Sequence, residues 1–125
     1  TDTYFNNKKS KNDTTQYNFN GQTLGKGPLV LAVIKLHVEN NSESTFSSLE
    51  AQFPKSIRGS DGVFDTIESA NEKYARNNKK RHFINPEDQI KLQDSTIAVS
   101  NQWTTSTIKP FISVAKELGY EINSI

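Results

Sequence analysis

The chain has 125 residues, 33% of them hydrophobic and 23% charged, and its 15 basic and 14 acidic residues leave a net charge of +1. This length fits one domain, and the balanced charge creates no overall positive potential that would attract a polyanion. The absence of cysteine excludes a disulfide framework, a thiolate zinc site and a cysteine nucleophile. The longest apolar run, residues 29–34, is far shorter than a membrane span of about 20 residues, so we expect no membrane partner and a cytoplasmic location.

The beginning of the chain predicts a leader and a short strand. Residues 1–16 are almost entirely polar or charged, so we expect a flexible leader before a single domain over residues 17–125. Tyr17–Phe19 alternates apolar and polar side chains and runs into Asn20-Gly21, which is typical of a strand that ends in a turn.

Three helices are expected next. Pro28 suits the first position of a helix, and residues 29–41 carry apolar side chains at helical spacing, which predicts a central helix. Thr45 is a suitable cap for a second, short helix that Pro54 ends. Asp61 is a suitable cap for a third helix. In that helix apolar residues recur at spacings of three and four: Val63, Phe64, Ile67, Ala70 and Tyr74.

The pattern then changes to the period of two that is typical of strands. The strand candidates are residues 82–84, 90–92 and 97–99. Polar residues 93–96 predict a hairpin between the last two, a Thr/Ser run after Trp103 caps a last helix that Gly119 ends, and residues 120–122 add a final strand. Three helices followed by a β-hairpin and a C-terminal helix are the order of a winged-helix fold. We therefore predict an α+β, winged-helix-like domain, with another small α+β arrangement as the alternative.

Enzyme motifs are weak in this chain. Residues 21–27 approach a phosphate-binding loop, but the segment is one residue short and has Gly27 where the magnesium-binding Ser or Thr must stand. The two histidines, His37 and His82, lack the spacing of a metal site, and no acid pair or Ser/His/Asp arrangement stands out. We therefore expect no cofactor and no metal, and an enzyme is the less favoured interpretation.

The basic residues give the strongest functional indication. Four of them fall within six positions without an acid, and two more precede the third helix, where the helix dipole also favours an anion. Residues 55–81 hold seven basic and four acidic residues, a local charge of +3. On a winged helix such side chains would hold DNA phosphates beside a helix in the major groove. The predicted nucleic-acid contacts are Lys55, Arg58, Ser60, Arg76, Lys79, Lys80 and Arg81.

Other interpretations of these residues stay open. The third helix carries acidic side chains that DNA would repel, and the hairpin tip holds Asp94 rather than Lys or Arg. A solvated charged face would also explain the basic residues. Trp103 lies among the hydrogen-bonding side chains of residues 101–105, and it either stacks a base, docks a partner or closes the core.

A group of short motifs runs through the chain: YNFNG from residue 17, LGKGPLVLAVIK from 24, TF, L and FP between 45 and 54, RGSDGV from 58, IAVSNQW from 97 and LGYEI from 118. Together they resemble a small bacterial domain of poorly defined role that is associated with restriction-type and other DNA-acting proteins. The resemblance spans residues 17–122, implies a DNA-linked defence context and carries no catalytic residue. Thr104 departs from it, because members of that group tend to have Gly after the Trp.

We therefore predict a non-catalytic module that binds double-stranded DNA or positions a DNA-acting protein, in a restriction or defence context. The alternative is a protein-interaction module of the same fold, in which Trp103 and the acidic face of the third helix meet another protein.

Overall fold

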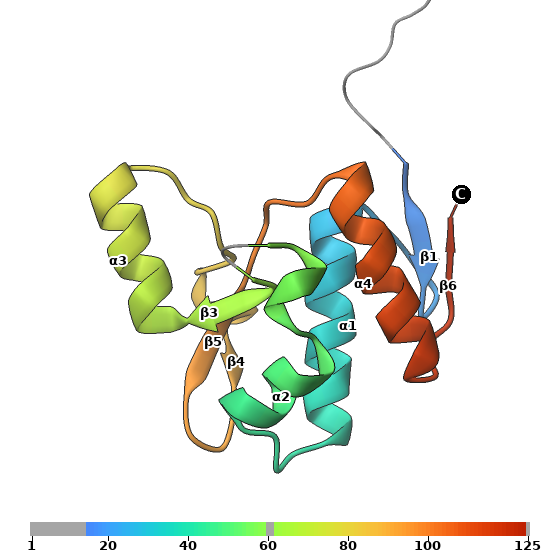
Figure 1. The fold of residues 1–125 in the computed structure, drawn as a ribbon, viewed down its shortest axis with the longest axis horizontal. Coiled ribbons are helices and arrows are strands. Elements are labelled where there is room, and N and C mark those ends of the chain that lie inside the picture. The colour runs from blue at the N-terminus through green and yellow to red at the C-terminus, as the bar shows by residue number, and fades with distance from the viewer. Residues whose placement is uncertain (1–14, 60–61, 125) are drawn as a thin grey trace, which may run out of the picture.

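The computed structural model describes residues 15–59 and 62–124. Within these residues the chain forms four α-helices and two small antiparallel sheets (Figure 1), which confirms the predicted α+β class. The elements are β1 (Tyr17–Phe19), β2 (Gln22–Leu24), α1 (Lys26–Asn40), α2 (Phe46–Gln52), the 3₁₀ turn η2 (Lys55–Ile57), β3 (Phe64–Thr66), α3 (Ile67–Asn77), the 3₁₀ turn η3 (Pro86–Asp88), β4 (Ile90–Lys91), β5 (Thr96–Val99), α4 (Thr105–Glu117) and β6 (Ile122–Ser124). Most of the predicted leader, together with Ser60 and Asp61, lies outside the described residues.

The first sheet joins the two ends of the described chain. Strand β1 lies in the middle, antiparallel to β2 on one side and to β6 on the other, with Phe19 opposite Ile122. The turn between β1 and β2 has positive φ angles at Asn20 (53°) and Gly21 (80°), which suits an Asn-Gly pair and confirms the predicted turn. The final strand predicted for residues 120–122 forms, but it begins at Ile122.

The second sheet comes from the middle of the chain and has the order β3-β5-β4. Strands β4 and β5 form the predicted hairpin. Strand β3, which was not predicted, pairs with the other edge of β5 and places Phe64 opposite Val99. The strand predicted for residues 82–84 is reduced to a single bridge between His82 and Ser100.

The topology does not support the winged-helix prediction. Strands are interleaved with helices, because β3 lies between α2 and α3 and β6 follows α4. The third helix was expected to begin at Asp61, but it begins after Thr66, whose Oγ1 accepts a hydrogen bond from the backbone N–H of Ser69 (3.2 Å). Val63 and Phe64 were expected on its buried face. They are buried, but in and beside a strand, because pairing with β5 satisfies their backbone and suits β-branched and aromatic side chains.

The hydrophobic core gathers around α1. Leu29, Val30, Val33 and Ile34 of this helix are fully buried, and α4 packs beside it (Figure 1). Burial of each such side chain stabilises the fold by about 1.5–3 kcal/mol. The predicted central helix is confirmed, and it begins two residues before Pro28.

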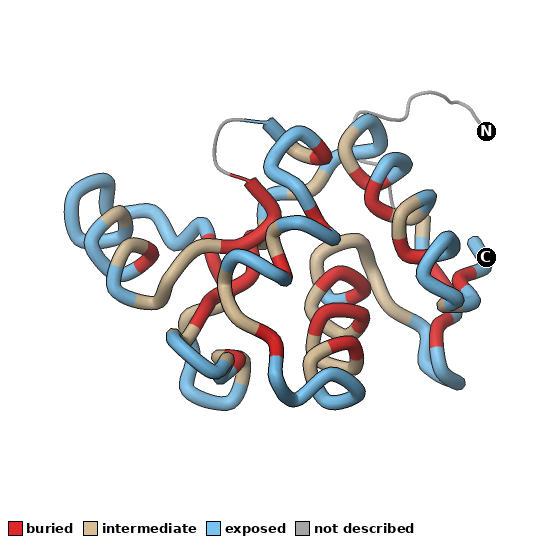
Figure 2. The backbone as a smooth tube through the Cα atoms, turned by 60° about the horizontal axis from the view of Figure 1, so that its bottom comes forward, coloured by how far each residue is buried: buried red, intermediate tan, exposed pale blue. Residues whose placement is uncertain are grey.

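Helix α3 stands apart from this core (Figures 1 and 2). It packs mainly on β3 and β5, and Ala70 is its only buried residue. Tyr74, which was expected on an apolar face, is 41% exposed. The reason is that α3 packs mainly against β3 and β5, so the side of the helix that carries Tyr74 stays at the surface.

The start of α3 is fixed by Asp65. Its carboxylate accepts hydrogen bonds from the backbone N–H of Thr66 (2.8 Å), from Oγ of Ser69 (2.8 Å) and from Nζ of Lys73 (2.9 Å). Partial burial works to raise the pKa of Asp65, but the hydrogen bonds from Lys73, Ser69 and Thr66 outweigh it, so the pKa lies below its usual value.

Candidate nucleic-acid interface

Residues 100–104 connect β5 to α4, and we call this segment the Trp103 loop. The indole Nε1 of Trp103 donates a hydrogen bond to the backbone oxygen of Ser100 (2.8 Å). The half-buried ring lies against Phe111 of α4, with ring centroids 5.5 Å apart and planes tilted by 59°. The polar end of the indole is thus satisfied within the loop, while part of the ring stays at the surface.

Arg58 joins turn η2 to the Trp103 loop. Its Nε donates to the backbone oxygen of Gln102 (2.6 Å), and its Nη1 donates to that of Gly62 (3.3 Å). Because a guanidinium presents its donors in a rigid fork, these bonds fix its position beside the loop. The sequence suggested a phosphate contact for Arg58, and the structure adds this positioning role.

Asn101 joins the basic segment, which we define as residues 76–81, to the same loop. Its backbone N–H donates to the oxygen of Arg81 (3.0 Å), and its side-chain Nδ2 donates to that of Lys80 (3.1 Å). Two segments that are far apart in the sequence are therefore held side by side.

A groove of about 360 Å³ opens at this junction. It is lined by Arg58, Asn101, Gln102, Trp103, Thr104 and Thr107. The hydroxyls of Thr104 and Thr107 belong to the capping box that begins α4, so the helix start fixes their positions. None of the described residues that line the groove is acidic, and Arg58 contributes a guanidinium. We call it the Trp103 groove.

The basic segment is exposed along its whole length. Its last three side chains form no ion pair with any carboxylate of residues 15–59 and 62–124. Nζ of Lys80 donates instead to Oδ1 of Asn85 (2.9 Å). Arg76 pairs with Glu72 at 3.3 Å, but both side chains are largely exposed, so this pair neutralises little. Most of the charge of the segment can therefore act on an external anion.

The structure thus brings part of the predicted site together. Arg58 and Trp103 line one groove, and the backbone of Lys80 and Arg81 adjoins it through Asn101. Each of these links joins residues that are distant in the sequence.

The remaining predicted contacts lie elsewhere. Lys55 is exposed on η2, shortly before Arg58, and Arg76 lies in the last turn of α3. Ser60 was expected at the start of the third helix, but α3 begins only after Thr66, and Ser60 itself is outside the described residues.

Sequence reasoning missed three surface residues near these elements. Asn101 and Gln102 were noted only as polar neighbours of Trp103, although a run of amide and hydroxyl side chains around a single Trp is a usable signal. Thr107 lines the groove because α4 begins with a capping box. Their roles depend on tertiary contacts that the sequence does not display.

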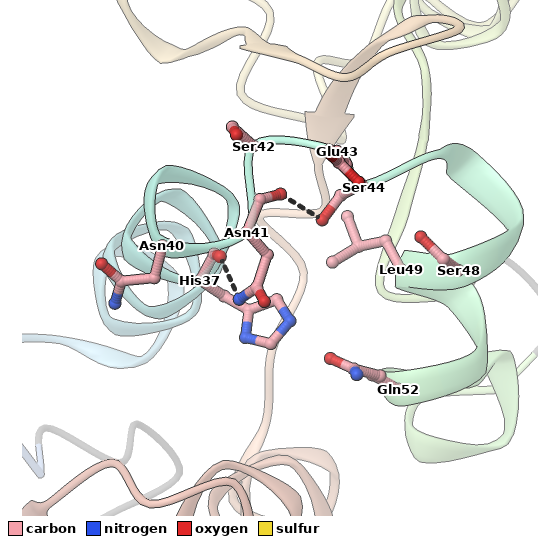
Figure 3. A pocket seen from close by; sticks show the side chains of 9 residues that line it. All are labelled: His37, Asn40, Asn41, Ser42, Glu43, Ser44, Ser48, Leu49 and Gln52. Atoms are coloured by element: carbon pink, nitrogen blue, oxygen red, sulfur yellow. Dashed lines mark hydrogen bonds between the residues drawn. The ribbon is translucent and has the colours of Figure 1, made fainter.

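A second cavity, of about 450 Å³, lies between the end of α1 and α2 (Figure 3). His37 is only 7% exposed. It points toward Gln52 of α2 in Figure 3, and its Nδ1 shares a 2.8 Å hydrogen bond with the hydroxyl of Tyr120. Burial lowers the pKa of His37, and a hydrogen bond with Gln52 raises it only in part, so the imidazole is mostly neutral at pH 7. The described lining includes Glu43 and no Lys or Arg, so this cavity lacks the positive charge of the Trp103 groove.

The described residues contain no group of three or more His, Asp or Glu side chains that could hold a metal ion. In the same part of the chain, no helix combines the length and the apolar composition needed to cross a membrane. Comparisons of the chain with protein-family models, with curated proteins and with solved structures gave no match.

Proposed function

We propose that this chain is a non-catalytic module that binds double-stranded DNA, in the context of a DNA-acting or defence protein. The observation that carries the proposal is the exposure of Lys79, Lys80 and Arg81 without ion pairs to described carboxylates. The segment is anchored through Asn101 to the Trp103 loop. Three cations are therefore presented from a fixed place, which suits contacts to successive phosphates.

The acidic residues just before α3 and along it oppose this proposal less than their formal charges suggest. Asp65 pairs with Lys73 at 2.9 Å, and Glu72 pairs with Arg76 at 3.3 Å. The partly buried pair with Lys73 cancels part of the field of Asp65 at a distance, whereas the exposed pair of Glu72 with Arg76 cancels little of it. Glu68 remains as an exposed acid on this helix.

The test is the salt dependence of DNA binding, measured by fluorescence anisotropy of a labelled duplex. Phosphate contacts release counterions, so the logarithm of the binding constant should fall with the logarithm of salt by about 0.9 per phosphate neutralised. Substituting Lys79→Ala, Lys80→Ala and Arg81→Ala together should weaken binding to any DNA sequence and make that slope shallower by about 2–3.

The matched control removes the same charge elsewhere. Lys91, Lys109 and Lys116 are exposed and lie outside the basic segment, so replacing all three by Ala should leave most of the slope in place. Absence of binding at low salt, or an equal loss in both triple variants, would show that the basic segment is not a DNA-binding surface.

A protein-interaction module is the second candidate. The observation that favours it is the exposure of Tyr74 on a helix that buries only Ala70, because aromatic side chains are enriched at protein interfaces. Under this proposal, binding of a purified partner protein should be lost in Tyr74→Ser and kept in the Lys79, Lys80 and Arg81 triple variant. The reverse pattern would argue against it.

A further inference from the structure

We propose that the Trp103 groove receives a single base that leaves the helical stack of the bound DNA. This inference rests on the proposed function, because it names the part of the DNA that the groove contacts. A paired base hides both faces within the stack, so only an unpaired or extruded base presents a face to a surface side chain.

The indole of Trp103 is suited to stacking rather than to hydrogen bonding. Its Nε1 already donates to the backbone oxygen of Ser100 (2.8 Å). The ring packs partly against the hydrophobic core, and the part of it that lines the groove contributes apolar surface. Base–aromatic stacking needs only such a surface, because every base has a π face.

Amide and hydroxyl side chains line the groove together with this ring, and Oε1 of the exposed Gln102 accepts no hydrogen bond from the described residues. Nε2 of Gln102 donates to Oδ1 of Asn101 (2.6 Å), which holds the two amides in one arrangement. Thr104 and Thr107 line the same groove, and their hydroxyls already bond backbone groups in the capping box of α4. Side-chain amides and hydroxyls are the groups with which proteins contact the edges of bases.

The charge of the groove fits a nucleotide. Arg58 supplies a guanidinium that two backbone oxygens hold in place, and no acidic residue is among the described residues of the lining. The cavity at His37 is the internal contrast, since Glu43 contributes to its lining and Lys and Arg do not. The described lining of the Trp103 groove thus carries a cation and no carboxylate, whereas that of the His37 cavity carries a carboxylate and no cation.

The groove also has the size for one base. Its volume of about 360 Å³ lies near the lower end of the about 300–1,000 Å³ that is usual for small-molecule sites. A duplex does not fit into such a space, whereas one planar base does. Extrusion requires least energy at a position without a pairing partner, so the groove should distinguish such positions from paired ones.

Trp103 is the only tryptophan in the chain, so its emission reports directly on this groove. The experiment compares two end-labelled duplexes of equal length, one fully paired and one in which a single base faces an abasic position. Label anisotropy measures affinity, and Trp103 emission measures stacking. We expect the second duplex to bind about 5- to 150-fold more tightly, which is the effect of one stacking contact, and to quench Trp103 emission.

Two variants test the groove separately. Trp103→Leu should bring the affinity ratio of the two duplexes close to one. Gln102→Ala keeps the backbone oxygen that accepts from Arg58, so the loop should be retained while the ratio falls. Gln22→Ala is the matched control, because this exposed glutamine lies on β2, outside the groove lining, and should keep the wild-type ratio.

The possible outcomes separate the inference from the proposed function. Equal binding of both duplexes without a change in Trp103 emission would overturn the inference and leave the proposed function standing. A preference that persists in Trp103→Leu would also overturn it. If neither duplex binds at low salt, both the inference and the proposed function are wrong.

Discussion

Asp65 should be the residue on which the position of α3 depends most. Three donors converge on its carboxylate, from the backbone of Thr66, the hydroxyl of Ser69 and the ammonium of Lys73. Because α3 buries only Ala70, few apolar contacts compensate for the loss of these bonds. We therefore expect Asp65→Ala to destabilise the domain and to loosen α3.

The expected loss in the free energy of unfolding follows from the number of these hydrogen bonds and from how exposed their side chains are. The hydrogen bonds from Thr66 and Ser69 contribute about 0.5–1.5 kcal/mol each. The Lys73 pair has side-chain exposures of 29% and 21%, so after screening it contributes at most about 1 kcal/mol. Asp65→Ala should therefore lower the free energy of unfolding by about 2–3 kcal/mol, which moves a urea midpoint down by about 1–2 M.

The assay is urea unfolding followed by circular dichroism, with a control on the same helix. Glu72→Gln breaks the pair with Arg76, whose side chains are 71% and 63% exposed, and should change stability by about 0.5 kcal/mol or less. Similar losses in Glu72→Gln and Asp65→Ala would refute the special role of the Asp65 carboxylate.

The pH dependence provides an independent check on Asp65. Its pKa is lowered in the folded state, so its stabilisation is fully present above the usual value of 3.8 and is lost as the pH falls through the lower folded value. Asp65→Asn removes the charge and keeps an acceptor for Thr66. The stability difference between wild type and Asp65→Asn should therefore be largest near neutral pH and shrink in acid. A difference that does not change with pH would contradict this account.

Two further predictions concern His37 and Gly62. Burial lowers the pKa of His37 below 6.5, so the stability that the neutral imidazole contributes is present above that pH and is lost as the pH falls. The free energy of unfolding, measured in urea, should therefore be smaller at about pH 5 than at about pH 7.5. His37→Gln should reduce that difference. Gly62 has a φ of +73°, and a Cβ there would lie 2.9 Å from Cγ of Lys55. Gly62→Ala should lower the free energy of unfolding by about 1–2 kcal/mol through the backbone alone. Its total cost should exceed that of Gly21→Ala, because a Cβ at Gly21 meets nothing within 4 Å. Equal costs at the two glycines, measured by urea unfolding, would show that the Lys55 contact adds nothing.

The parts of the fold that were predicted correctly depend on local chemistry. The Asn20-Gly21 turn needs only two residues that tolerate positive φ angles, and the caps at Thr45 and Thr104 need only a hydroxyl within reach of a nearby N–H. Strand β3 was missed because it depends on pairing between Phe64 and Val99, which are far apart in the sequence. The helical spacing of Val63 and Phe64 carried no information about that pairing.

The candidate site also has one part that local sequence predicts and one part that depends on tertiary contacts. The cluster of Lys79, Lys80 and Arg81 is visible in the sequence because its members are neighbours. Its position beside Trp103 is not, since that depends on two hydrogen bonds from Asn101. The residue types therefore indicated that the surface is basic, whereas hydrogen bonds between distant segments determined that this basic cluster lies beside Trp103.

The bonds within the Trp103 loop also bear on how affinity would arise. The backbone oxygens of Ser100 and Gln102 and the N–H of Asn101 are all engaged within the chain, so a bound base would order the loop little further, and little conformational entropy would be lost. The exposed side chains of the basic segment would lose more, but their attraction to phosphate acts at longer range and is screened by salt. Salt dependence should therefore report on the charged contacts of the basic segment and Arg58, and Trp103 emission on stacking in the groove, so that both contributions can be measured in one titration.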